Sequence, residues 1–374
     1  MIMCAVCAAG CVYPFTAELG QSEQALVVES DIVIGGITEV TLSYVNPVGV
    51  TVPVKKANLA DICVEASDGS VYTGIFANGS GRIDTTEADP SLSYRLKIHV
   101  NDTDYESDWR QACTPVVVDG ITYRADEESG RFKIFLNCHS DQPYFRVDFD
   151  EKWEYRSQYE GECRYQVPIS GTTLWNGGHG LVLPLTAQDV STHRCWQSSS
   201  TSGLFFSTSS SDSGRLVEGE LMDIGCTDKR LSWLYRIDVT IRPLSREKYD
   251  YLSFMEQTSG NAGDLFSAMP GQPAGNIHNV GDPNEMVVGY VDVSDLVTVR
   301  KYISLGDHWF YREANNFPEP VLAQEADWYS LYQQGYYPYR SDSKSGQVYW
   351  ADKRCLDCRE FGGETQMPED WPEE

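Results

Sequence analysis

The sequence has few basic residues and no long apolar run. It contains 29 Lys and Arg against 55 Asp and Glu, a formal net charge of -26. A field of this sign repels the phosphates of nucleic acids and anionic membrane surfaces. No apolar run approaches the roughly 20 residues that a membrane-spanning helix needs. We therefore expect neither nucleic-acid binding nor a helical membrane span.

The common catalytic signatures are also missing. There is no Gly-x-Ser-x-Gly motif, no His-Glu-x-x-His motif, no phosphate-binding loop and no dinucleotide-binding glycine motif. No two of the six His lie at the spacing of metal ligands on a helix. His278 is the one His that we keep as a candidate binding residue, because a Gly-rich loop can direct a side chain into a cleft. These absences predict no cofactor and favour a protein without chemical turnover.

The chain is nevertheless long enough, at 374 residues, for two or three globular domains. Its hydrophobic content of 41% and aromatic content of 12% are those of a folded protein, since disordered acidic chains have few aromatic residues.

The first ten residues are all apolar or small, and they end in Ala8-Ala9-Gly10, directly before Cys11. Small residues before a Cys are typical of a bacterial lipoprotein cleavage site, at which the Cys thiol receives a diacylglycerol. We therefore expect residues 1–10 to be a signal-peptide remnant, Cys11 to be lipidated and residues 11–22 to form the anchor and linker. The alternative is a buried first strand with an ordinary free Cys.

The cysteine count agrees with export to an oxidising compartment. Of 11 Cys, removal of Cys4, Cys7 and Cys11 leaves an even set of disulfide candidates, whose pairing the sequence does not specify. This set is Cys63, Cys113, Cys138, Cys163, Cys195, Cys226, Cys355 and Cys358. Cys355 and Cys358 form a C-x-x-C motif without a second half for zinc, so structural disulfides are favoured over a redox-active pair.

Most of the chain alternates apolar and polar residues with a period of two, as half-buried strands do. In Arg236–Arg242, for example, Ile237, Val239 and Ile241 share one face. Turn-rich clusters separate such runs, which predicts a mainly β protein with two β-sandwich-like domains. We expect an immunoglobulin-like sandwich at 23–114, a larger β domain at 115–360 and an acidic tail at 361–374. One short helix is expected near 245–258, after the N-cap residue Ser245, followed by a long ordered loop at 260–283.

Two sets of carboxylates are candidate sites. Asp102, Asp104, Glu106 and Asp108 alternate along the chain, so on a strand they share a face and form a weak Ca²⁺ candidate, although a solvated loop is favoured. Asp148, Asp150 and Glu154, near Trp153, suggest the carboxylate pair of a glycosidase beside an aromatic platform.

Aromatic residues cluster near the C-terminus in a polar context, which is the composition of a recognition surface. The alternative is that they fill the core of the last sheet. We expect a mixture, with Trp328 or Trp350 buried and an exposed turn at Tyr336–Tyr339. The candidate binding residues are Trp328, Tyr332, Tyr336, Tyr337, Tyr339 and Trp350.

Several motifs occur in an order that resembles a family of Bacteroidota outer-membrane lipoproteins known as domain of unknown function 4249. They include Leu26–Ser30, Cys195-Trp196, Tyr235–Tyr251, Val288-Gly-Tyr290, Cys355–Cys358, Gly362-Gly363 and Trp371. The resemblance implies a lipid-anchored protein of the outer membrane, on its periplasmic face or at the cell surface, that is encoded beside TonB-dependent receptors.

We therefore expect a ligand- or partner-binding accessory subunit of a TonB-dependent transporter, with a small ligand or peptide as its cargo. Two other classes stay open. One is a hydrolase that acts on a glycan or peptide through Asp148, Asp150 or Glu154. The other is a structural surface protein or adhesin, which would show a flat aromatic patch without a concavity.

Overall fold

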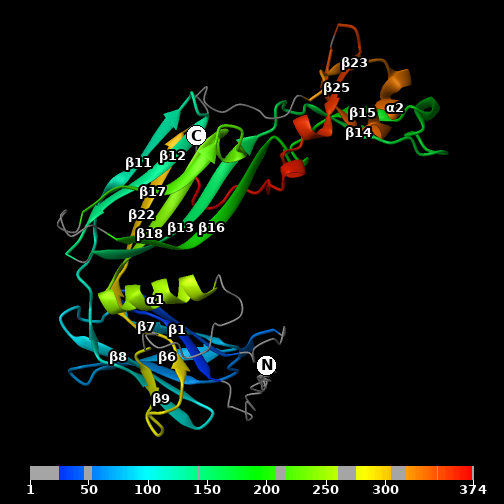
Figure 1. Cartoon of the computed structure of the whole chain (residues 1–374). Helices are drawn as coiled ribbons and strands as arrows, with labels where there is room; N and C mark the ends of the chain where they lie inside the picture. Colours follow the sequence, from blue (N-terminus) through cyan, green and yellow to red (C-terminus); the bar gives the residue numbers. More distant parts are fainter. Residues whose placement is uncertain are drawn as a thin grey trace, which may run out of the picture. The chain divides into compact units, whose positions relative to one another are not determined.

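The computed structural model describes residues 25–45, 53–141, 143–207, 215–259, 275–304, 317–342 and 344–372. These residues are mainly β, which confirms the predicted fold class (Figure 1). Two α-helices occur in the described ranges, α1 (Arg246–Ser259) and α2 (Trp328–Gln333). None of the helices described is long and apolar enough to cross a membrane.

The chain divides into two compact units, each made of two segments. The first unit combines Met1–Ala112 with Asp250–Val293, and the second combines Cys113–Tyr249 with Ser294–Glu374. Helix α1 and strand β21 (Val293–Asp295) cross the limits between the two.

The first unit is built around one large sheet. The strands of this sheet are β1 (Leu26–Ser30), β3 (Ile37–Tyr44), β4 (Lys55–Lys56), β5 (Asp61–Ala66), β6 (Val71–Ala77), β7 (Ser80–Asp84), β8 (Ser93–Val100), β9 (Thr103–Ser107), β10 (Arg110–Gln111), β19 (Ile277–Asn279) and β20 (Val287–Val288). Strand β2 (Ile32–Ile34) pairs instead with β21 in a separate two-stranded sheet. The strand order is β19-β9-β8-β5-β6-β7-β3-β1-β20, so the strands at the two ends of the order are consecutive in the chain. Alternate side chains of β8, such as Leu96 and Ile98, are buried in its core.

The return of β19 and β20 to this sheet corrects the predicted domain limits. Sequence analysis assigned residues 115–360 to one C-terminal domain, but β19 pairs with β9 and β20 pairs with β1 in parallel. Such pairings join residues far apart in the chain, and local patterns do not encode them. Of the loop expected at 260–283, residues 260–274 lie outside the described chain.

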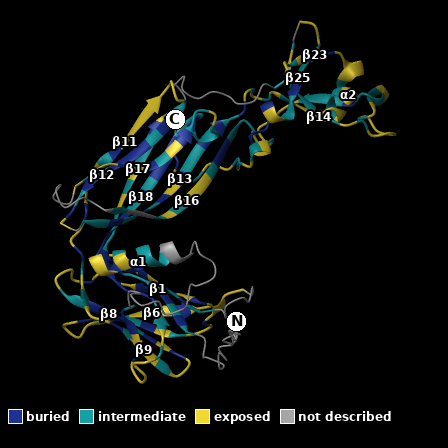
Figure 2. Ribbon diagram, viewed as in Figure 1, coloured by how far each residue is buried: buried dark blue, intermediate teal, exposed yellow. Residues whose placement is uncertain are grey.

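The second unit contains a β-sandwich of two sheets. Its strands are β11 (Val117–Asp126), β12 (Arg131–His139), β13 (Tyr144–Arg156), β14 (Cys163–Gln166), β15 (Leu181–Pro184), β16 (Arg194–Ser207), β17 (Arg215–Gly225), β18 (Leu234–Leu244), β22 (Val297–Ser304), β23 (Val321–Ala323), β24 (Tyr336–Ser341) and β25 (Val348–Asp352). Sheet β11-β12-β17 and sheet β16-β13-β18-β22 share one core, which Phe132, Phe145 and Ile237 help to fill. Figure 2 shows the buried residues of this sandwich in dark blue along β12, β13 and β18.

The same unit carries two smaller sheets, β14-β15 and β23-β25-β24, together with α2. Single-turn 3-10 helices occupy Asn176–Gly178, Lys229–Leu231, Glu325–Asp327, Lys353–Cys355 and Cys358–Phe361.

Helix α1 forms where it was predicted. The Ser245 hydroxyl accepts a hydrogen bond from the Lys248 N–H at 3.2 Å, which satisfies one of the free amides of the first turn. Helix α2 was not predicted, because its sequence, Trp328–Gln333, is short and mostly aromatic or polar.

Candidate functional site

A cavity of about 740 Å³ lies in the second unit, between β13 and β16 on one side and the chain from 362 to 370 on the other. Its β wall consists of Lys152, Trp153, Trp196, Gln197 and Ser198, and the opposite wall includes Glu364, Gln366, Met367, Glu369 and Asp370. This volume is within the range of about 300–1,000 Å³ that is usual for small-ligand sites. Apolar rings and polar groups therefore meet in a space large enough for a ligand.

Two links fix the C-terminal segment beside β16. Cys195 of β16 forms a disulfide with Cys358. Trp196 and Glu364 then exchange two main-chain hydrogen bonds of 2.8 and 3.0 Å. A Cβ atom at Gly363 would lie 2.6 Å from the Cβ of Cys195, so only glycine permits this close approach.

Glu154 joins the end of this segment to the sheet. Its side chain is almost fully buried, and it accepts hydrogen bonds from Arg194 at 2.9 and 3.0 Å and from Arg156 at 3.1 Å. The indole N–H of Trp371 donates to the same carboxylate at 3.1 Å. Both carboxylate oxygens are therefore occupied, as a buried charge requires.

Asp370 makes a second connection between the segment and the sheet. It pairs with Arg236 at 2.6 Å, Arg300 at 3.3 Å and Lys152 at 3.7 Å. The hydrogen bond from Arg236 is the main reason that the pKa of Asp370 lies below its usual value. Three cations therefore hold this carboxylate at the wall of the cavity.

The carboxylates proposed for a hydrolase all have hydrogen-bond or ion-pair partners in the structure. The Glu154 carboxylate accepts hydrogen bonds from two arginines and from Trp371, as described above. Asp148 accepts hydrogen bonds from Arg146 and from the Gly203 N–H, and Asp150 accepts one from Ser200. Asp148 and Glu154 lie about 20 Å apart along β13, at roughly 3.3 Å per residue, which exceeds the spacing of a glycosidase pair, whereas the roughly 7 Å between Asp148 and Asp150 does not.

The aromatic cluster near the C-terminus is mostly a small core. Trp350 is fully buried and packs with Tyr165, which also contacts Tyr332. Tyr332 contacts Tyr337, and Tyr339 contacts Tyr159 and Tyr349, whereas Trp328 is half-buried. The prediction of an exposed turn at Tyr336–Tyr339 is wrong, because these residues belong to β24 and are buried or half-buried.

The alternating acidic residues also have local partners. Asp102 lies in the two-residue turn between β8 and β9, with a φ of 57°, and Asp104 and Glu106 follow on β9. Asp104 pairs with His99 at 2.7 Å, and Glu106 pairs with Lys97 at 3.3 Å and with Arg95. Within the described ranges there is no group of three or more residues that could hold a metal ion.

His278 lies on β19, exposed and 4.0 Å from Asp108. A second cavity of about 460 Å³ in the first unit is lined by Cys63, Lys97, His99, Asp104 and Glu106, among others. Its charged groups largely neutralise one another, and burial raises the pKa of the Cys63 thiol, which makes it a weaker nucleophile at neutral pH. The larger cavity is therefore the better candidate site.

One disulfide connects the described cysteines, and it is not within the C-x-x-C motif. Cys358 pairs with Cys195, 163 residues earlier. Cys63, Cys138, Cys163 and Cys226 are free thiols, while Cys113 and Cys355 are buried. Burial raises the pKa of Cys138 and of Cys163 to about 12. Cys11, the predicted lipidation site, lies outside the described residues.

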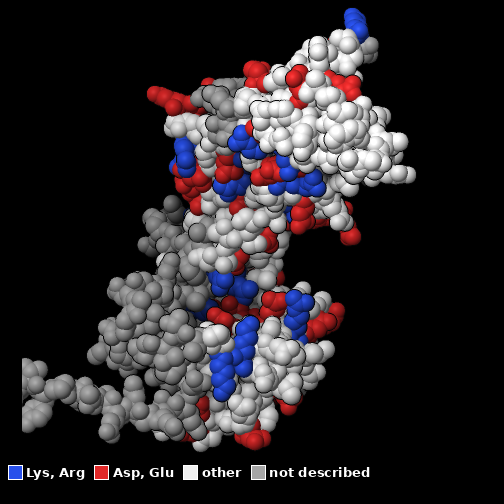
Figure 3. Space-filling view, turned by 90° about the vertical axis from the view of Figure 1, so that its right-hand side faces the viewer, with Lys and Arg blue, Asp and Glu red and all other residues white. Residues whose placement is uncertain are grey.

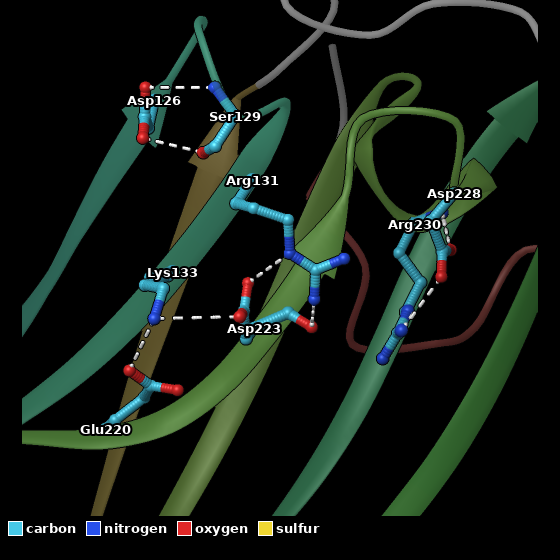
Figure 4. Close-up of polar contacts among 8 residues, drawn as sticks. All are labelled: Asp126, Ser129, Arg131, Lys133, Glu220, Asp223, Asp228 and Arg230. Atoms are coloured by element: carbon cyan, nitrogen blue, oxygen red, sulfur yellow. Dashed lines mark hydrogen bonds and ion pairs between the residues drawn. The ribbon is translucent and has the colours of Figure 1, made fainter.

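Elsewhere on the sandwich, acidic side chains are paired with basic ones. Figure 4 shows Lys133 of β12 between Glu220 and Asp223 of β17, at 2.9 and 3.6 Å, and Arg131 on Asp223 at 2.8 Å. Figure 3 shows basic and acidic residues intermixed on the coloured face of the molecule. By contrast, Glu364 and Glu369 of the large cavity have no ion-pair partner in the part of the chain that the structure describes.

A family model described as Domain of unknown function (DUF4249) matches residues 12–300. The chain belongs to this family. The match covers the first unit and most of the sandwich, and it ends before the C-terminal motifs at 355–358, 362–363 and Trp371. The description of the family names no activity.

No curated protein sequence matches the chain. Among solved structures, one similar chain comes from the work titled "Complete structure of manganese lipoxygenase of Gaeumannomyces graminis and partial structure of zonadhesin of Komagataella pastoris". The two sequences are 9% identical, the TM-score is 0.12, and the alignment covers 60% of this chain and 89% of the other chain. A likeness at this TM-score carries no argument about fold or function.

Sequence reasoning named few of the residues that line the cavity. Of the lining residues, Trp153 was noted beside the suggested glycosidase carboxylates, and Trp196 and Gly362 only as landmarks of the family resemblance. The acidic tail at 361–374 was expected to be a separate segment. One sequence signal could have indicated that this segment packs against another strand. It is the pair Gly362-Gly363 shortly after Cys358, because consecutive glycines allow two backbones to approach closely.

Proposed function

We propose that this protein is a lipid-anchored, ligand-binding accessory subunit of a TonB-dependent transporter in the outer membrane, without chemical turnover. The observation that carries the binding role is the cavity of about 740 Å³ beside β16. It combines tryptophan rings, amides and carboxylates, which is the usual lining of a recognition site.

Membership of the family supports the location and the partner, because the resemblance described above implies outer-membrane lipoproteins encoded beside such receptors. The Ala8-Ala9-Gly10-Cys11 motif supports lipidation. The use of Asp148, Asp150 and Glu154 in hydrogen bonds and ion pairs favours binding over hydrolysis.

The experiment that tests the proposal compares the wild-type protein with two variants in the cells that naturally produce it. We expect Cys11→Ser to move the protein from the membrane fraction to the soluble fraction, because the lipid is its anchor. We expect Trp196→Ala to stay in the membrane and to lose the ligand that native mass spectrometry detects on the wild type. A wild-type protein that is soluble, or one that releases no ligand-dependent mass, would contradict the proposal.

A further inference from the structure

We propose that the cavity and the adjoining edge of β16 bind an extended peptide that carries a Lys or Arg side chain. This inference rests on the proposed function, because it names the ligand class of the same site. It depends on three observations: the charge of the cavity, its tryptophan rings and the unpaired edge of the strand.

The residues that line the cavity carry an excess of negative charge, with three carboxylates, Glu364, Glu369 and Asp370, against one ammonium, that of Lys152. Asp370 is matched by Arg236, Arg300 and Lys152, and Lys152 is the one basic residue in the lining. Glu364 and Glu369 remain without an ion pair among the residues described. A ligand with a positive charge therefore gains two nearby carboxylates, and the net charge of -26 on the whole chain attracts it from a distance.

The tryptophans favour the same kind of group. An ammonium or guanidinium over an indole ring is attracted by the ring's negative face. The structure already contains one such contact, with the Arg194 guanidinium 5.3 Å from the centre of the Trp196 ring. Trp196 is 6% exposed, and its indole N–H has no acceptor within the described chain. Because this nitrogen is itself buried, a ligand in the cavity contacts Trp196 through its ring and not through the N–H.

The strand edge supplies the main-chain component. β16 is at the end of the sheet order β16-β13-β18-β22. The N–H and C=O of Trp196 point away from β13, since they bond to Glu364. Because strand residues alternate with a period of two, the same groups of Ser198 and Ser200 point outward as well.

Within the described ranges no strand pairs with this edge beyond the contact at Trp196, and the edge begins at the cavity. Ser198, Ser199 and Ser200 are exposed, and Ser198 also lines the cavity. The short side chains here leave room for another strand, whereas edge strands are usually protected by Lys, Pro or a covering segment. An added peptide strand would bond to Ser198 and Ser200 and would place a basic side chain among Trp196, Glu364 and Glu369.

The test uses short acetylated and amidated peptides of Thr and Ser with one central Lys, Glu or norleucine. Binding to the full-length protein is measured by tryptophan fluorescence and calorimetry. We expect the Lys peptide to bind about tenfold more tightly than the Glu peptide, since two carboxylates and a ring each contribute modestly. Equal affinities, no binding of any peptide, or displacement of the Lys peptide by a neutral oligosaccharide would overturn the proposal.

One double variant tests the side-chain contribution to peptide binding, and one single variant tests the main-chain contribution. The double variant Glu364→Gln with Glu369→Gln should abolish the preference for Lys, while Glu127→Gln with Glu128→Gln, which makes the same charge change in an exposed turn, should keep it. Ser198→Pro removes an outward N–H without changing any charge, and it should weaken binding of the Lys peptide and of the norleucine peptide alike. A Lys preference that survives in the Glu364/Glu369 double variant, or Ser198→Pro binding like the wild type, would contradict the model. Circular dichroism checks that each variant is folded.

Failure of this inference is distinguishable from failure of the proposed function. If a transporter co-purifies with the protein and no peptide binds, only the ligand class is wrong. If peptides bind as expected and the protein is neither lipidated nor associated with a transporter, the accessory role is wrong and the site assignment stands.

Discussion

Trp371 donates its indole N–H to Glu154 at 3.1 Å, across 217 residues of sequence. This bond holds the end of the described chain on the outer face of the sandwich, where Arg156 and Arg194 share the same carboxylate. The position of the chain from 362 to 370, and with it the cavity, depends on this contact together with the Cys195–Cys358 disulfide.

Replacement of Trp371 by Ala should destabilise the second unit by about 3–5 kcal/mol, the usual cost of truncating a buried tryptophan. Trp371 is 4% exposed, and its loss also removes a donor from buried Glu154. Denaturant unfolding followed by circular dichroism measures the change. Trp175→Ala is the matched control, because Trp175 is 47% exposed and should cost under about 1 kcal/mol. Equal effects of the two substitutions would show that the C-terminal contact is not formed.

The disulfide can be mapped directly. Peptide mass spectrometry without reduction should recover Cys195 linked to Cys358. The thiols that are partly or fully buried should react with iodoacetamide slowly, or only after unfolding. These thiols are Cys63, Cys138, Cys163 and Cys226. Removal of the bond by Cys195→Ser should cost about 2–4 kcal/mol. A bond between Cys355 and Cys358 would instead support a redox-active motif and would contradict the structure.

A single methyl group at position 363 should disturb the same region. Gly363→Ala would place its Cβ 2.6 Å from the Cβ of Cys195 and 2.8 Å from the Tyr155 hydroxyl, so the segment must shift. We expect a loss of about 1–3 kcal/mol in unfolding free energy. Gly161→Ala, whose Cβ would meet only Leu185 at 3.8 Å, should be nearly neutral. A Gly363→Ala protein as stable as the wild type would place the segment elsewhere.

The pKa values of His99 and His193 should be shifted in opposite directions from the usual value of 6.5. The hydrogen bond to Asp104 raises the pKa of His99, whereas burial lowers the pKa of His193. His99 therefore contributes stability below the unfolded-state pKa that is lost as pH rises through its folded value. His193 contributes stability above the unfolded-state pKa that is lost as pH falls through its folded value. NMR titration of the two imidazoles checks this, and a higher midpoint for His193 than for His99 would refute it.

Much of the fold was predictable because alternation is a local signal. Apolar and polar residues alternate throughout Arg236–Arg242, from Phe145 on in Tyr144–Phe149 and up to Ile134 in Arg131–Leu136, and each run lies in a strand of the sandwich. Ser245 likewise predicted the start of α1. The pairing of β19 with β9 was not predictable, because strand partners are chosen by long-range packing that no short pattern specifies.

The site was harder to predict than the fold. The aromatic cluster at 328–350 has the composition of a binding surface, yet Tyr165 and Trp350 pack together, because aromatic rings serve cores and surfaces equally well. The cavity could not be found from the sequence, since it forms only where residues 362–370 return to β16. Glu154 was a reasonable candidate by residue type, and its partners Arg194 and Trp371 became visible only in three dimensions.

We propose above that the protein is a lipid-anchored partner of a transporter. The most direct test of this proposal is a mild-detergent pull-down from native membranes with a tag after Glu374, followed by mass spectrometry of the partners and of the amino-terminal peptide. The account predicts a TonB-dependent β-barrel transporter in the eluate and an amino-terminal peptide that begins with diacylated Cys11. Recovery of the protein alone and without lipid would contradict it.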